Sequence, residues 1–90
     1  MEVEKLISAL EETIGFLQKS QSSDWSPLSI EEIIRRLEIE VSKARNAKPL
    51  DVNLLARLFA PTGVIQETSV ENGWGTSFLH LSEVVDEFTR

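Results

Sequence analysis

The chain has 90 residues, no cysteine, and 15 acidic against 9 basic residues, which gives a net charge of −6. This length predicts one domain spanning residues 1–90, and the lack of cysteine excludes disulfide frameworks, cysteine-ligated metal centres and thiol catalysis. We expect a cytoplasmic protein, because no apolar run approaches the roughly 20 residues of a membrane-spanning helix and the N-terminus is acidic. The negative charge argues against nucleic acid and anionic membranes as partners.

The first predicted element is an amphipathic helix over residues 3–19. Its apolar residues recur at spacings of three and four and share one stripe, formed by Val3, Leu6, Leu10, Ile14 and Leu17. Gly15 lies within this helix, where it costs about 1 kcal/mol relative to alanine, and we expect it to admit a closely packed neighbour. A polar loop follows, and Trp25 is predicted to anchor this loop to the core.

A second helix is predicted to begin after Ser29. Ser29 and Glu32 have the spacing of a capping box, in which the serine hydroxyl accepts from the backbone of Glu32 and the glutamate reaches back to Ser29. The apolar stripe then continues through Ile30, Ile33, Ile34, Leu37, Val41 and Ala44. With a short loop between them, the first two helices are expected to form an antiparallel hairpin.

Charged residues of the second helix are predicted to pair along its surface. Glu31–Arg35 and Glu32–Arg36 are i,i+4 pairs in the favourable orientation. Asn46 is a suitable stop, and the following proline prevents continuation. The glutamates of both helices are expected on the faces opposite the apolar stripes.

A third, shorter helix is predicted from a cap at Asp51 to about Ala60. The next segment, residues 64–71, is rich in β-branched residues and alternates weakly, which favours an extended or irregular conformation. Because no other part of the chain resembles a strand, such a segment needs a partner, and pairing with a second copy is a first indication of a dimer.

The last predicted element is a helix beginning at Thr76 or Ser77, after a turn formed by residues 72–75. Its apolar residues are Phe78, Leu81, Val85 and Phe88, with Leu79 and Val84 beside them. The complete prediction is a mainly α fold: a helical hairpin, a short third helix, an extended or irregular segment at 64–71 and a C-terminal helix, together forming a small helical bundle.

No pattern of catalytic residues is visible, so we expect no enzymatic activity and no cofactor. His80 and Glu83 could share a helix face, but this pair is only part of a metal site, and we favour a surface histidine. Gly63, Gly73 and Gly75 lack the context of a phosphate-binding loop. Adjacent carboxylates on a helix diverge by about 100° and cannot share a proton.

Charge is unevenly distributed, with acidic ends around a basic middle that comprises Arg35, Arg36, Lys43, Arg45, Lys48 and Arg57. Pairing of these residues within the chain, or with another copy, is more economical than nucleic-acid binding, because no aromatic residues lie among them. The segment from Leu58 to Gly75 concentrates glycine, proline and aromatic residues. It makes Arg57, Phe59, Trp74 and His80 the candidates for an interaction surface or pocket.

Four short features of the sequence belong together: Trp25 before the second helix, Leu58-Phe59, Thr62-Gly63 and Gln66-Glu67. In these features the chain resembles a family of small uncharacterised bacterial proteins, which bears a distant resemblance to immunity-like proteins. The resemblance implies an immunity or antitoxin-like inhibitor of a bacterial toxin, and it implies no catalytic residues.

Three functions therefore remain open. The favoured one is protein–protein interaction, by a homodimer or with another protein, because the chain lacks catalytic groups and has more apolar residues than a domain of this size readily buries. The second is the immunity-like function. The third is a small-ligand-binding or enzyme-accessory domain with a pocket near residues 59–80.

Overall fold

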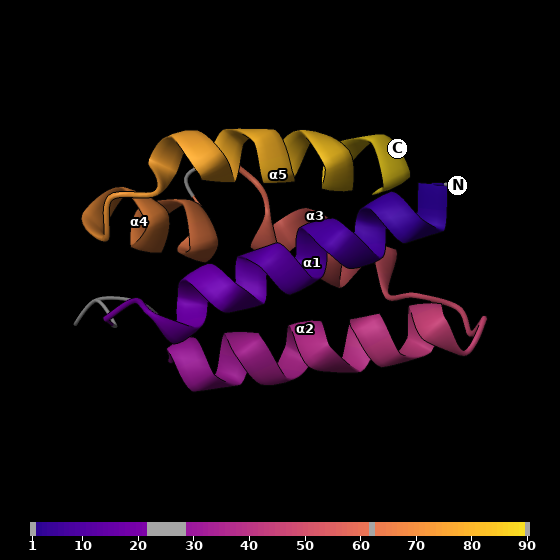
Figure 1. Ribbon diagram of the computed structural model, residues 1–90. Coiled ribbons are helices and arrows are strands. Elements are labelled where there is room, and N and C mark those ends of the chain that lie inside the picture. The colour runs from indigo at the N-terminus through magenta and orange to yellow at the C-terminus, as the bar shows by residue number, and fades with distance from the viewer. Residues whose placement is uncertain (1, 22–28, 62, 90) are drawn as a thin grey trace.

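The apolar stripes of the sequence become the packed faces of five helices. The computed structural model describes residues 2–21, 29–61 and 63–89. Its helices are α1 (Glu2–Gln18), α2 (Ile30–Arg45), α3 (Val52–Leu58), α4 (Val64–Glu71) and α5 (Gly75–Thr89) (Figure 1). The prediction of a mainly α bundle is confirmed, whereas the loop that contains Trp25 lies outside the described residues.

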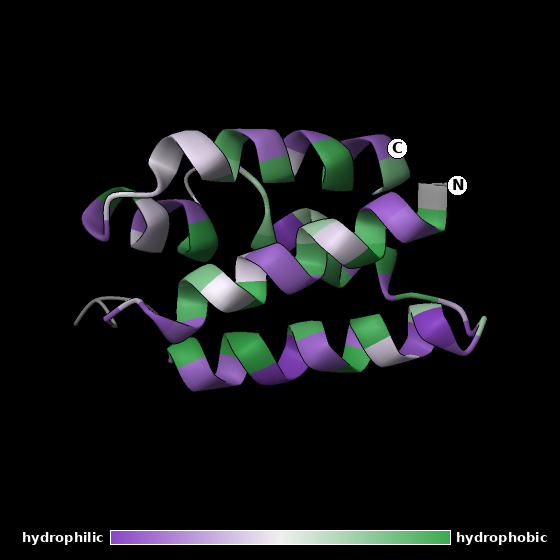
Figure 2. Cartoon of the chain, viewed as in Figure 1, coloured by the Kyte–Doolittle hydropathy of each residue, from purple (hydrophilic) through white to green (hydrophobic). Residues whose placement is uncertain are grey.

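Helix α1 lies at the centre of the bundle. It packs against α2 on one side and α5 on the other, and α5 also covers α3 and α4 (Figure 1). In Figure 2 the apolar residues of α2 lie mainly on the side facing α1. The radius of gyration is 12.1 Å, close to the value of about 12 Å for a compact chain of this length.

Both ends of α2 are capped, but the predicted capping box is only half formed. The Ser29 hydroxyl accepts from the Glu32 amide at 3.2 Å, and Asn46 is the C-cap. The Glu32 carboxylate does not reach back to the Ser29 amide, because its two oxygens accept from arginines further along the helix. The Glu32 carboxylate accepts from Arg36, which confirms that i,i+4 pair, and also from Arg35 at 3.0 Å. The prediction that Arg35 pairs with Glu31 is therefore wrong, since Arg35 reaches the carboxylate three residues before it.

Glu40 corrects the expectation that the glutamates of the first two helices lie opposite the apolar stripes. Only 1% of Glu40 is exposed, and it lies on the same side of α2 as the buried Leu37 and Val41. One carboxylate oxygen accepts from the Asp51 amide at 2.7 Å and the other from the Lys43 ammonium at 3.0 Å. These two hydrogen bonds compensate the cost of burying the carboxylate, and the bond to Asp51 holds the N-cap residue of α3 against α2.

Residues 64–71 form helix α4, so the prediction of an extended or irregular segment is wrong. Ile65, Thr68 and Ser69 are buried, at the i, i+3, i+4 spacing of a helical face. The Thr68 and Ser69 hydroxyls donate to the carbonyls of Val64 and Gln66, so they enter the core without unpaired polar groups. Burial of this face outweighs the weak β propensity of the segment. The indication of a dimer from an unpaired strand is lost with it.

Gly63 and Gly15 differ in the space available for a side chain. A Cβ at Gly63 would lie 2.8 Å from the Ala60 carbonyl oxygen, so the tight turn between α3 and α4 requires glycine there. At Gly15 an added Cβ would meet no described atom within 4 Å. The expectation that Gly15 admits a closely packed neighbour is therefore wrong for the described part of the chain.

The turn between α4 and α5 is attached to the end of α1. The rings of Trp74 and Phe16 are stacked, with centroids 4.8 Å apart and an interplanar angle of 7°. The Trp74 indole N–H donates to the Ser20 hydroxyl at 2.8 Å, and the Asn72 side chain bonds the backbone of Gln21. These contacts fix the position of α5 beside α1, and so create the surface between the two helices.

Candidate functional site

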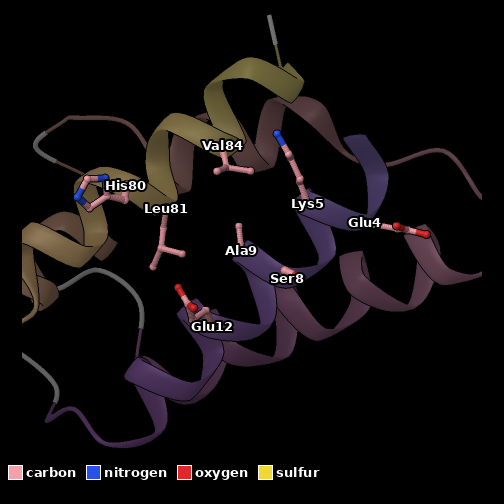
Figure 3. A pocket seen from close by; sticks show the side chains of 8 residues that line it. All are labelled: Glu4, Lys5, Ser8, Ala9, Glu12, His80, Leu81 and Val84. Carbon is pink, nitrogen blue, oxygen red and sulfur yellow. The ribbon is translucent and has the colours of Figure 1, made fainter. Parts of the chain in front are cut away.

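A groove of about 520 Å³ runs between α1 and α5. Eight residues line it, five from α1 and three from α5: Glu4, Lys5, Ser8, Ala9, Glu12, His80, Leu81 and Val84 (Figure 3). The groove has an apolar floor, because Ala9, Leu81 and Val84 lie between the two helices (Figure 3). Because the side chains of Ser8 and Ala9 are small, the groove is deepest along the middle of its α1 wall.

Charged side chains stand at the two ends of this groove. Lys5 lies at the end nearer Val84, whereas Glu12 lies at the other end with Leu81 and His80 (Figure 3). Lys5 and Glu12 are seven residues apart, which separates them by about 10 Å along the helix. Neither makes an ion pair with a described residue.

The groove continues beyond Lys5 into a smaller hollow of about 90 Å³. Lys5, Val84, Glu87 and Phe88 line this extension, and two of these residues also line the main groove. Helix α5 therefore contributes the Glu87 carboxylate at the Lys5 end of the groove and the His80 imidazole at the Glu12 end. Glu4 also lines the groove beside Lys5, so this end carries one basic and two acidic side chains, whereas the other end carries Glu12 and His80.

The four candidate residues predicted from the sequence are placed differently. His80 is exposed and lines the groove. Phe59 and Trp74 are only 1% and 6% exposed and belong to the core, where Phe59 is stacked on Phe78. Arg57 is exposed on α3 and does not line the groove. Phe59 therefore packs against α5 and Trp74 against the end of α1, and of the four predicted residues only His80 lines the groove.

The other residues of the groove were not among the predicted candidates. Lys5, Ser8 and Glu12 share a helix face at spacings of three and four, which is a detectable signal in the sequence. This face adjoins the apolar stripe, and the sequence alone predicts an ordinary solvated surface there. Only the position of α5 beside it makes it one wall of a groove.

Most of the basic middle of the sequence is paired within the chain. Arg35 and Arg36 bond Glu32, Lys43 bonds Glu40, and Arg45 bonds Glu11 of α1 at 2.6 Å. The prediction of intramolecular charge complementarity is confirmed for these four residues. Two basic residues of this region, Lys48 and Arg57, make no ion pair with a described residue.

The described residues contain no group of three or more histidine, aspartate or glutamate side chains arranged to hold a metal ion. No helix formed by residues 2–21, 29–61 or 63–89 has the length and apolar character needed to cross a membrane.

No protein-family model matches the chain, and neither the curated proteins nor the solved structures yield a match. The resemblance to immunity-like proteins therefore remains a prediction.

Proposed function

We propose that this protein acts in the cytoplasm through protein–protein interaction, and that the groove between α1 and α5 is its binding surface. One observation carries the proposal: the groove combines an apolar floor with charged side chains that have no ion-pair partner in the described chain. A protein surface with these features suits a partner that covers the floor and supplies the opposite charges.

The contrast with α2 supports this choice of surface. Four basic residues of α2 form ion pairs with three glutamates of the same chain. Lys5 and Glu12 keep their charges available, and both border the apolar floor formed by Ala9, Leu81 and Val84. Binding energy at protein interfaces comes mainly from such apolar contacts, while the charges at their edge set orientation and specificity.

Site-specific photo-crosslinking in cells tests the proposal. A photoreactive amino acid replaces His80, which is exposed in the groove, and the adducts are identified by mass spectrometry. Ser8→Arg blocks the middle of the groove, and because Ser8 is exposed, the helix tolerates the change. Ser42→Arg introduces the same side chain on the exposed face of α2 and is the matched control.

We expect a defined protein adduct at His80 that Ser8→Arg reduces severalfold and Ser42→Arg leaves unchanged. A lack of any protein adduct at His80 would contradict the proposal. An adduct that survives Ser8→Arg at full yield would show that the partner does not occupy the groove, and would contradict it equally.

A further inference from the structure

We infer that the occupant of the α1–α5 groove is a basic amphipathic helix of another protein, whose apolar face covers the floor and whose lysine and arginine side chains meet the carboxylates around it. The inference rests on the proposed function and names the chemistry of the partner. It is carried by one combination: an apolar floor lies between two helices whose lining side chains include three carboxylates and one ammonium group.

The shape of the groove suits a helical segment. Helices α1 and α5 lie side by side, with the start of α1 near the end of α5 (Figure 1). The lining residues of α1 run from Glu4 to Glu12, which is about 12 Å along the helix, so about two to three turns of a third helix cover them. The described residues form helices and no strand, so an extended segment would find no sheet edge to which its backbone could bond.

Three carboxylates of the lining have no ion-pair partner among the described residues. Glu4 and Glu12 belong to α1 and Glu87 belongs to α5, and all three residues are exposed. A partner that covers the apolar floor and is basic along its flanks pairs these carboxylates. An acidic partner would instead bring like charge against all three.

The acidic charge extends over both helices that form the groove. Helix α1 has four acidic residues and one lysine, whereas α5 has three acidic residues and neither lysine nor arginine. Of these, Glu11 forms an ion pair with Arg45 of α2. The unpaired carboxylates give this face a negative potential, which attracts a basic segment and repels an acidic one. For the same reason the α1–α5 face of a second copy is a poor occupant.

Lys5 is the lining residue that opposes a basic partner, and it restricts how the helix can lie. It stands at one end of the groove with Glu87, whereas Glu12 and His80 stand at the other end. A partner whose residue opposite Lys5 is neutral or acidic avoids this repulsion, so Lys5 selects the direction and register of the bound helix. A probe that is basic throughout should therefore bind more tightly when Lys5 is replaced by glutamate.

The inference is tested with two amphipathic peptides of roughly 14 residues, which is long enough to form a helix. Both have leucine at helical spacing, and the remaining positions are all lysine in one peptide and all glutamate in the other. Binding of each fluorescein-labelled peptide to the full chain is measured by fluorescence anisotropy. We expect the lysine peptide to bind at least about tenfold more tightly than the glutamate peptide, and to weaken severalfold when salt is raised from about 20 to about 150 mM.

Charge reversals inside and outside the groove make the test specific. Glu12→Lys and Glu87→Lys each take the net charge from −6 to −4, and so does Glu38→Lys on the exposed face of α2. We expect each groove variant to raise the dissociation constant of the lysine peptide about fivefold, and Glu38→Lys to raise it less than about twofold. Lys5→Glu should lower it about threefold relative to Lys48→Glu, which has the same net charge of −8. All five positions are exposed, and circular dichroism checks that each variant is folded.

The outcomes separate this inference from the proposed function. Equal affinities for the two peptides, or no measurable binding of the lysine peptide, overturn the inference. So does an effect of Glu38→Lys as large as that of Glu12→Lys, because the peptide would then respond to net charge rather than to the groove. In cells, the adduct at His80 can be a second copy of this chain, or a segment with neither lysine nor arginine. If Ser8→Arg removes such an adduct, the basic helix is wrong and the proposed interaction surface stands.

Discussion

The side-chain amide of Asn72 forms two hydrogen bonds with the backbone of Gln21, 51 residues earlier in the chain. Its oxygen accepts from the Gln21 amide at 3.0 Å, and its nitrogen donates to the Gln21 carbonyl at 3.1 Å and to the Thr68 carbonyl at 2.9 Å. The amide therefore joins the end of α1 to the end of α4, and with the stacked Trp74 and Phe16 it determines how α5 lies beside α1.

This geometry predicts that Asn72→Asp destabilises the protein at least as much as Asn72→Ala. Alanine removes all three bonds, and because the two to Gln21 are exposed to water we expect a cost of about 1–2 kcal/mol of unfolding free energy, at the low end of the usual contributions. Aspartate can still accept from the Gln21 amide, but its second oxygen faces the carbonyls of Gln21 and Thr68 without a proton to donate. Urea unfolding followed by circular dichroism measures both differences.

The control for this prediction is Asn53→Asp. Asn53 is exposed near the start of α3, where a negative charge is compatible with the helix dipole. We expect its effect to stay within about 0.5 kcal/mol. Equal small effects of the aspartate at both positions would show that the Asn72 amide does not hold α1 and α4 together.

Glu40 is predicted to be the most important charged residue for stability. Glu40→Ala removes the carboxylate that binds both the Asp51 amide and the Lys43 ammonium, and we expect a loss of about 2–3 kcal/mol. Glu40→Gln keeps an acceptor for the Asp51 amide, while Lys43 is exposed enough to turn toward water, so the loss should be smaller. The unfolding midpoint in urea, compared at constant slope, measures both.

Glu38→Ala on the exposed face of α2 provides the comparison for Glu40. This glutamate makes no ion pair with a described residue, so its removal should change the unfolding free energy by less than about 0.5 kcal/mol. If Glu40→Ala were as mild as Glu38→Ala, the buried carboxylate would not be what holds the start of α3 against α2.

Alanine substitutions at Gly15 and Gly63 are predicted to have opposite signs. Gly15→Ala adds a methyl group that meets no described atom and removes the entropic cost of glycine in a helix, so it should stabilise by about 0.5–1 kcal/mol. Gly63→Ala forces a carbon to within 2.8 Å of the Ala60 carbonyl oxygen. The backbone must shift to relieve this contact, and we expect a loss of about 1–3 kcal/mol.

Thermal unfolding of the two glycine variants, measured side by side, tests both signs with the same chemical change. Destabilisation by Gly15→Ala would indicate that a neighbour closes on α1 at this position. An unaffected Gly63→Ala variant would mean that the junction between α3 and α4 adapts at no cost, and that glycine is not required there.

Helices whose apolar residues recur at helical spacing and whose ends carry recognisable caps could be predicted from the amino-acid sequence. The stripe from Leu6 to Leu17, the cap at Ser29 and the cap at Asp51 all lie where the pattern predicts them. Such signals are local, because each depends on residues within one or two turns of the same helix.

Features that depend on the residues packed opposite a side chain became visible only in the folded chain. Thr68 and Ser69 read as polar in the sequence, but they enter the core because their hydroxyls bond the carbonyls of their own helix. Glu40 reads as a surface charge and is buried because the Asp51 amide and Lys43 meet it.

The same reason explains the candidate site. Lys5, Ser8 and Glu12 are unremarkable on an isolated helix, and they line a groove only because α5 packs beside them. Trp74 and Phe59 were predicted as site residues from the sequence, yet both are buried in the core of the bundle. Whether a side chain lines the groove or is buried in the core depends on the residues packed against it from other helices. The spacing of residues along the chain does not specify these neighbours.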